Sequence, residues 1–127
     1  MWYNGVGSTY AIRKEDAMKV AIIGSRSLRV TNLEDYLPSD TTEIVSGGAI
    51  GIDRCAEEYA RCHGIPTKIF LPDYKQFGKA APIKRNVEIV DYADTVIAFW
   101  DGVSRGTRFV IEESRRQNKP MRIFVSK

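Results

Sequence analysis

Five short apolar runs alternate with longer segments of helical periodicity, and this alternation constrains the fold more than any other feature of the chain. The runs cover residues 20–23, 43–46, 67–71, 95–100 and 121–125. The runs at 20–23 and 95–100 are apolar almost throughout, which is typical of strands buried on both faces of a parallel sheet. The sequence therefore predicts an α/β domain with a three-layer, Rossmann-like open parallel sheet of five strands in the order 3-2-1-4-5.

Three main helices are expected between these runs. Residues 52–63 repeat apolar side chains at helical spacing, and Gly64 and Pro66 follow as termination signals. A second helix is expected to begin near Pro82, because proline suits a first helical turn. Its inward-facing stripe is predicted to be Ile83, Val87 and Val90. A third helix is expected from Thr107 onwards, with Glu112 and Arg116 as an i, i+4 ion pair on its outer face.

The turn between the second run and its helix reads Ser46-Gly47-Gly48-Ala49-Ile50-Gly51-Ile52-Asp53. Glycines allow positive φ angles and leave no Cβ in the way, so backbone N–H groups can approach a ligand closely at the start of a helix. This arrangement suits a phosphate group. A tight connection with no ligand is the alternative, and the glycines alone do not decide between them.

Two further turns are expected to meet the first one. Gly24-Ser25-Arg26 follows the first run, and Asp101-Gly102-Val103-Ser104-Arg105-Gly106-Thr107 follows the fourth. In an open parallel sheet, ligands bind beyond the carboxyl ends of the strands, where the strand order reverses around the first strand. The convergence of three turns at this edge therefore predicts a ligand site. There is no GxGxxG after a strand and no P-loop motif, so neither of those two nucleotide sites is expected.

The polar segment 78–86 supplies another candidate contact. Arg85 is expected near the start of the second helix, where a cation opposes the helix dipole. An anionic ligand would explain an arginine at this place, and a tolerated surface charge would explain it equally well.

Composition bounds the class of protein. A chain of 127 residues with a net charge of +3 and no basic block is an ordinary single domain whose overall charge does not favour nucleic acid.

Cys55 and Cys62 are expected on one helix, roughly 10 Å apart along its axis, which is too far for a disulfide. With one histidine, a metal site is not expected. No apolar run approaches the roughly 18 residues of a membrane span, so we expect a cytoplasmic protein without membrane contact.

Residues 1–17 show no sustained period and precede a second methionine, Met18. They are expected to form an irregular N-terminal extension outside the folded core. Their aromatic side chains leave open a contact in a homo-oligomer.

Four segments that are far apart in the sequence carry a family resemblance. They are Gly24-Ser25-Arg26, residues 46–53, residues 78–86 and residues 98–107. Together they resemble the YspA/YpsA-related branch of the SLOG superfamily, which joins the DNA-processing protein A (SMF) domain with the LOG phosphoribohydrolases. The resemblance covers roughly residues 18–126. It implies a SLOG-like Rossmannoid domain at 18–127 that binds nucleotides or nucleotide-derived ligands, and it names no cofactor.

The resemblance to the LOG enzymes departs at one position. Their PGGxGTxxE motif places a catalytic glutamate three residues after the threonine, and Val110 stands at the corresponding position here. A hydrolase is therefore not favoured. If the chain is an enzyme acting on nucleoside monophosphates, Asp53 and Asp101 are the candidate acid/base residues.

The leading hypothesis is a module that binds a nucleotide or nucleotide-derived phosphate ligand, with ligand sensing as one role. The alternatives are the nucleoside-monophosphate enzyme and a DNA-processing accessory. The expected ligand-binding residues are Gly24, Ser25, Arg26, Ser46, Gly47, Gly48, Ala49, Gly51, Asp53, Arg85, Asn86, Asp101, Gly102, Ser104, Arg105, Gly106 and Thr107.

Overall fold

A computed structural model describes residues 17–126 and confirms the predicted sheet. Its five strands are β1 (Lys19–Gly24), β2 (Glu43–Ser46), β3 (Thr67–Ile69), β4 (Thr95–Trp100) and β5 (Met121–Val125). All neighbouring pairs are parallel, and the order is β3-β2-β1-β4-β5. β1 and β4 are buried along their length apart from their end residues, as their apolar sequences require.

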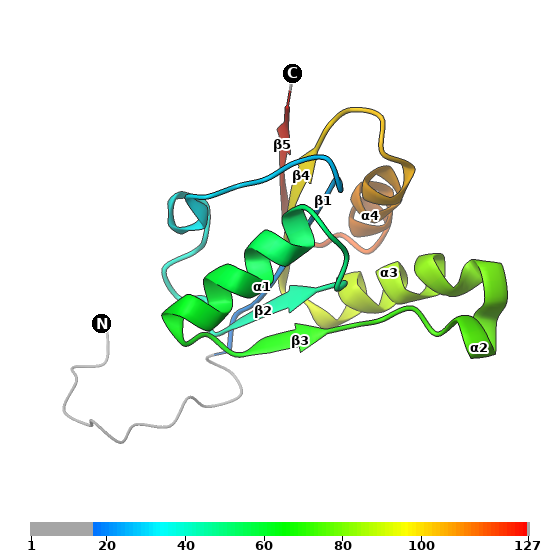
Figure 1. The fold of residues 1–127 in the computed structure, drawn as a ribbon, viewed down its shortest axis with the longest axis horizontal. Coiled ribbons are helices and arrows are strands. Elements are labelled where there is room, and N and C mark those ends of the chain that lie inside the picture. The colour runs from blue at the N-terminus through cyan, green and yellow to red at the C-terminus, as the bar shows by residue number, and fades with distance from the viewer. Residues whose placement is uncertain (1–16, 127) are drawn as a thin grey trace.

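The helices form two outer layers. They are α1 (Ile52–His63), the short α2 (Tyr74–Phe77), α3 (Ala81–Tyr92) and α4 (Arg105–Arg116), and two short 3-10 turns lie at Leu33–Asp35 and Gly78–Ala80. Figure 1 shows α1 over β1 and β2, with α3 and α4 together on the other side of the sheet. Each layer buries its own apolar cluster against one face of the sheet. Ile22, Ile44 and Ile97 belong to the α1 side, and Val45, Ile89 and Val96 belong to the side of α3 and α4.

The inward face of α3 differs from the prediction. Ala81, Ile89 and Val90 are buried, whereas Ile83 is 51% exposed and Val87 is only partly buried. The first turns of α3 project beyond the sheet towards α2, so Ile83 has no strand to cover it (Figure 1). The prediction of Ile83 as a core residue was therefore wrong.

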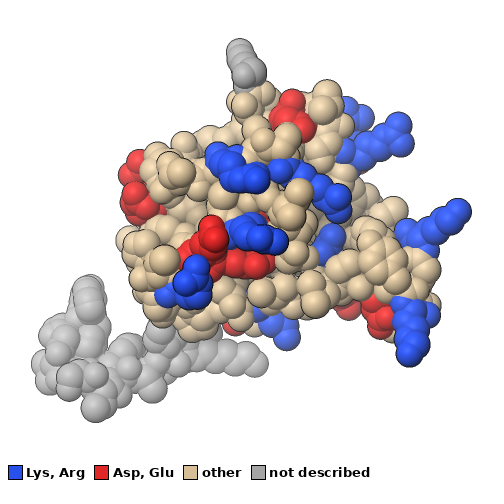
Figure 2. Space-filling view, viewed as in Figure 1, with Lys and Arg blue, Asp and Glu red and all other residues tan. Residues whose placement is uncertain are grey.

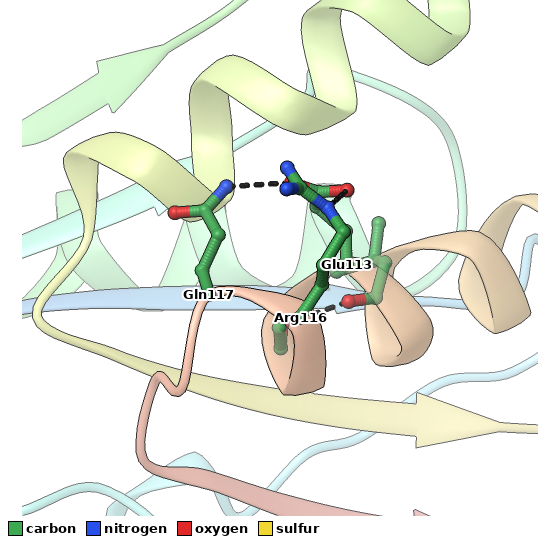
Figure 3. Close-up of polar contacts among 5 residues, drawn as sticks. Glu113, Arg116 and Gln117 are labelled. Carbon is green, nitrogen blue, oxygen red and sulfur yellow. Dashed lines mark hydrogen bonds and ion pairs between the residues drawn. The ribbon is translucent and has the colours of Figure 1, made fainter.

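The ion pair on α4 also differs from the prediction. Arg116 pairs with Glu113 instead of Glu112, and Gln117 donates a second hydrogen bond to the same carboxylate over 2.7 Å (Figure 3). Glu113 is only 6% exposed, and the hydrogen bonds from Arg116 and Gln117 lower its pKa. The expected pair with Glu112 was wrong because Glu113, on the buried side of the helix, is the acid that Arg116 reaches.

Two boundaries move slightly. β3 ends at Ile69 instead of residue 71, and α4 begins at Arg105, two residues before Thr107, because Ser104 serves as its N-cap. Within residues 17–126, no helix is both long and apolar enough to cross a membrane. The predicted extension at residues 1–17 lies almost wholly outside the described residues.

Candidate functional site

A cavity of about 450 Å³ opens at the carboxyl edge of the sheet, beside the ends of β1 and β4. β1 has β2 on one side and β4 on the other, so this is the point where the strand order reverses. The cavity lies where the sequence predicted that the turns would converge.

The three turns and α3 contribute to the cavity wall unequally. The expected residues that line it are Gly24, Arg26, Ala49, Asp53, Arg85, Asn86, Asp101, Ser104, Gly106 and Thr107. The other expected residues, Ser25, Ser46, Gly47, Gly48, Gly51, Gly102 and Arg105, lie in the same turns but outside the lining.

Five further lining residues were not predicted: Ile23, Ser27, Pro82, Ile89 and Val110. The sequence signals were present but had been assigned to other roles. Ile23 ends an apolar run and Pro82 opens a helix, so both were interpreted as structural. Val110 is an apolar residue of α4, and the structure places its side chain, 2% exposed, at the cavity.

The first glycine turn has its own carboxylate as a hydrogen-bond partner. The Ala49 N–H donates to Asp53 Oδ2 over 3.2 Å, and the Gly47 backbone lies beside the same carboxylate. The Gly48 N–H donates to Ser46 Oγ over 3.3 Å, and that hydroxyl donates to Glu57 Oε2 over 2.7 Å. Two successive N–H groups of the turn, those of Gly48 and Ala49, are therefore already bound to side chains of the protein.

Asp53 is the buried titratable group of the cavity wall. Its side chain sits in the first turn of α1, and the residue is 6% exposed. Burial raises the pKa of Asp53 to about 6, against the opposing influence of the Ala49 N–H and of Arg85, while Glu57 adds to the rise. At neutral pH this carboxylate is largely ionised, but it accepts a proton far more readily than an exposed aspartate.

Three hydrogen bonds account for the position of Arg85 near the start of α3, where a cation opposes the helix dipole. Its Nη1 donates to the Gly47 carbonyl over 2.5 Å and to the Phe70 carbonyl over 3.3 Å, and its Nε donates to Asn86 Oδ1 over 2.8 Å. Burial lowers the pKa of Arg85, and the nearby Asp53 carboxylate opposes this shift. Arg85 thus ties α3 to the segments that follow β2 and β3, in addition to lining the cavity.

The turns after β1 and β2 are in direct backbone contact at Gly51. Gly51 has a φ of +80°, and a Cβ at this position would lie 2.6 Å from the Arg26 carbonyl oxygen and 2.7 Å from that of Ser25. Ser25, which is 1% exposed, also links β1 to the turn after β4, because its Oγ accepts the Asp101 N–H over 3.0 Å. These contacts fix the three turns relative to one another.

Asp101 organises the second turn. Its Oδ1 accepts the N–H groups of Val103 and Ser104 over 2.9 and 2.8 Å, and its Oδ2 accepts the Ser27 hydroxyl over 3.2 Å. The hydrogen bonds from Val103 and Ser104 are the main reason that the pKa of Asp101 is lowered. A carboxylate held ionised in this way fits a role in building the turn better than one in proton transfer.

The first turn of α4 reaches the cavity wall at Gly106 and Thr107. Ser104 Oγ accepts the Thr107 N–H over 3.4 Å, which caps one donor of the helix. The N–H groups of Arg105 and Gly106 have no acceptor within the helix, as is general for a first turn. Gly106 lines the cavity, and a Cβ built there would have open space around it. This helix end can therefore receive an anion.

Among residues 17–126, no three His, Cys, Asp or Glu side chains lie close enough together to hold a metal ion. Comparison with family models, curated proteins and solved structures found no match for this chain.

Proposed function

We propose that this protein binds a nucleotide or nucleotide-derived phosphate ligand in the cavity at the carboxyl edge of the sheet, as a member of the SLOG superfamily. The observation that supports this most directly is the first turn of α4. It presents amide groups, an unobstructed Gly106 and the cavity in one place. Ligand sensing is the role that fits a binding site of this kind.

The charges around the cavity support the same ligand class. Arg26 lines the cavity and is exposed, and within residues 17–126 its guanidinium makes no hydrogen bond or ion pair, since Arg29 donates to the Arg26 backbone carbonyl. Its guanidinium is thus available to a phosphate, with which it makes charge-assisted bonds. On the molecular face in Figure 2, acidic and basic side chains stand beside one another over α1, and further Lys and Arg side chains lie above them in this view.

Calorimetric titration against nucleotides, cyclic nucleotides, ADP-ribose derivatives and single-stranded DNA tests the proposal. Gly106→Val should abolish binding, because its side chain would cover the amides of the helix end without meeting another part of the fold. Glu112→Val introduces the same side chain on the exposed face of the same helix and should bind normally. Binding that survives Gly106→Val would place the site elsewhere.

Arg26→Ala gives an independent measure. We expect binding to weaken by about 1.5 to 3 kcal/mol if the guanidinium contacts the phosphate. The thermal stability should not change, because the side chain is exposed. Arg85→Ala is a poorer probe, since Arg85 also holds the Gly47 and Phe70 carbonyls.

One observation favours the enzyme alternative. Asp53 lies at the cavity with a pKa of about 6, close to the value that suits a general acid or base at neutral pH. Incubation with nucleoside monophosphates should nevertheless release no free base, because the cavity presents Val110 where the LOG enzymes have their glutamate. Turnover that Asp53→Asn slows by roughly 100-fold would reverse this ranking.

A further inference from the structure

The segment from β3 to the first turn of α3 leaves much of its apolar surface uncovered. No residue of α2 or of the 3-10 turn after it is buried. α2 is four residues long, and an isolated helix of this length is not stable in water without packing against another surface. Figure 1 shows α2 and the start of α3 projecting beyond the sheet, away from α1.

Five large apolar side chains of this segment are exposed to solvent, with exposed fractions between 36% and 67%. They are Ile69, Leu71, Tyr74, Phe77 and Ile83, and we call them the α2 patch.

Contacts within the chain show that the patch is one continuous surface. A Cβ built on Gly48 would lie 2.7 Å from Leu71 Cδ2 and 3.3 Å from Ile69 Cγ2, so these two side chains lie side by side. The two aromatic residues of the patch are three positions apart on α2 and share one face of that helix. Lys84 Nζ lies 5.8 Å from the centre of the Phe77 ring, which brings the first turn of α3 against α2.

The size of the α2 patch matches one side of a stable dimer. Side chains of this size that are about half exposed leave on the order of 100 Å² each, so the patch approaches ~500 Å². This is close to the upper limit of about 600 Å² for the largest apolar patch of a monomer. A standard interface buries about 800 Å² on each partner, and a little more than half of that area is apolar.

The edge of the sheet beside the patch does not favour pairing with another strand. β3 is three residues long and carries the exposed Lys68, and a short edge strand with a lysine opposes strand addition. A partner must therefore pack on the side chains of the patch.

The charges next to the patch suit a second copy of the chain. Lys84 and Glu88 are exposed on α3, one helical turn apart, and neither makes a hydrogen bond or ion pair with another side chain within residues 17–126. In a two-fold arrangement with the two α3 helices antiparallel, Lys84 of each copy can face the glutamate of the other.

We propose that the α2 patch is the contact surface of a homodimer, in which a two-fold axis places the patch of one copy on that of a second copy. Such a contact is self-complementary, because each copy covers the same residues on the other. It gives α2 the packing that it lacks in the single chain. The contact needs no ligand in the cavity, so it is independent of the proposed function.

Sedimentation equilibrium of the wild-type protein tests the dimer. At roughly 100 μM the protein should have twice the mass of the chain, because interfaces of standard size bind with micromolar or higher affinity. A monomer at this concentration would overturn the inference. Lys75 and Lys79 are exposed in the same segment, so anionic lipid is the competing partner. Binding of such a monomer to vesicles that contain anionic lipid would assign the patch to a membrane surface.

Ile83→Glu and Val125→Glu are a matched pair of variants. The two side chains are 51% and 53% exposed, and Val125 lies on β5, at the opposite edge of the sheet. Ile83→Glu should weaken the dimer by at least about 100-fold, because the new charge enters the two-fold contact twice. Val125→Glu should dimerise like the wild type. A dimer that persists in Ile83→Glu, or that is lost in Val125→Glu, would place the contact elsewhere.

Hydrogen exchange of the wild type locates the contact without any substitution. The amides of residues 74–77 should exchange at least about tenfold more slowly where the dimer predominates than where the protein is diluted to the monomer. Equal exchange rates at the two concentrations would refute the proposed surface, even if Ile83→Glu fails to fold.

Discussion

Replacing Asp53 by asparagine should stabilise the protein at neutral pH and leave its stability nearly unchanged in acid. In the folded protein the pKa of Asp53 is raised from 3.8 to about 6, mainly by burial. The folded state therefore holds the proton more tightly than the unfolded chain does. Protonation favours folding, and this contribution is fully present below about pH 4 and is lost as the pH rises through about 6.

The size of the effect follows from the shift in pKa. About two units correspond to about 3 kcal/mol of unfolding free energy at pH 7 and above, a cost that the ionised Asp53 carries and that the Asp53→Asn variant avoids. The groups that face this carboxylate are Arg85 from α3, Glu57 from α1 and the amides of Gly47 and Ala49. Asparagine resembles the protonated acid, so it keeps an acceptor for the Ala49 N–H.

Urea denaturation of both proteins at a series of pH values between about 4 and 8 measures the difference. The two curves should agree near pH 4, separate through pH 6 and run parallel above it, with the variant more stable. Asp40→Asn, which removes a carboxylate from an exposed turn, should stay within about 0.5 kcal/mol of wild type throughout. A wild type that is more stable than Asp53→Asn near pH 8, or a gap that does not depend on pH, would refute the reasoning.

Three other outcomes are expected. Gly51→Ala should destabilise the protein much more than Gly64→Ala in thermal unfolding. Both glycines have a positive φ, but only at Gly51 would a Cβ meet other atoms, which belong to the backbone of the turn after β1. Equal losses of stability would contradict this close approach. Thiol counting without reductant should find two free thiols, with exposed Cys62 reacting before half-buried Cys55 in the native state, and fewer than two thiols or the reverse order would count against this. Deletion of residues 1–17 should preserve cooperative unfolding, and its loss would make this segment part of the fold.

The strand order could be predicted from the sequence because it depends on features that are local to each run. The apolar runs at β1 and β4 are typical of buried strands, and the helical segments between successive runs indicated crossover connections, which join parallel strands. The convergence of three turns at one edge then followed from the topology. The position of the cavity agrees with this expectation.

Whether the backbone N–H groups of each turn are free or already hydrogen-bonded could not be predicted in the same way. The sequence predicts that the N–H groups of this turn can approach a ligand, yet Ser46 and Asp53 occupy those of Gly48 and Ala49. Whether an amide is free depends on where a nearby side chain points, and spacing alone does not determine this. An aspartate in the first turn of the helix, four residues after Ala49, was the available signal.

The inward face of α3 was missed for a related reason. Helical periodicity gives the angle between side chains but does not show how far a helix extends past the sheet. Ile83 has the correct character for a core residue, but it lies on the part of α3 that projects towards α2 (Figure 1).

The parallel sheet also determines how the protein should be immobilised for binding measurements. Met18 leads into β1 at the amino edge, whereas β5 ends at the carboxyl edge, where the Ser126 N–H donates to the Trp100 carbonyl over 2.8 Å. Trp100 directly precedes Asp101, which lines the cavity. A capture tag joined directly before Met18 would hold the cavity away from a sensor surface. The same tag after β5 would bring that surface close to the mouth, and association measured there should be slower for the same affinity in solution.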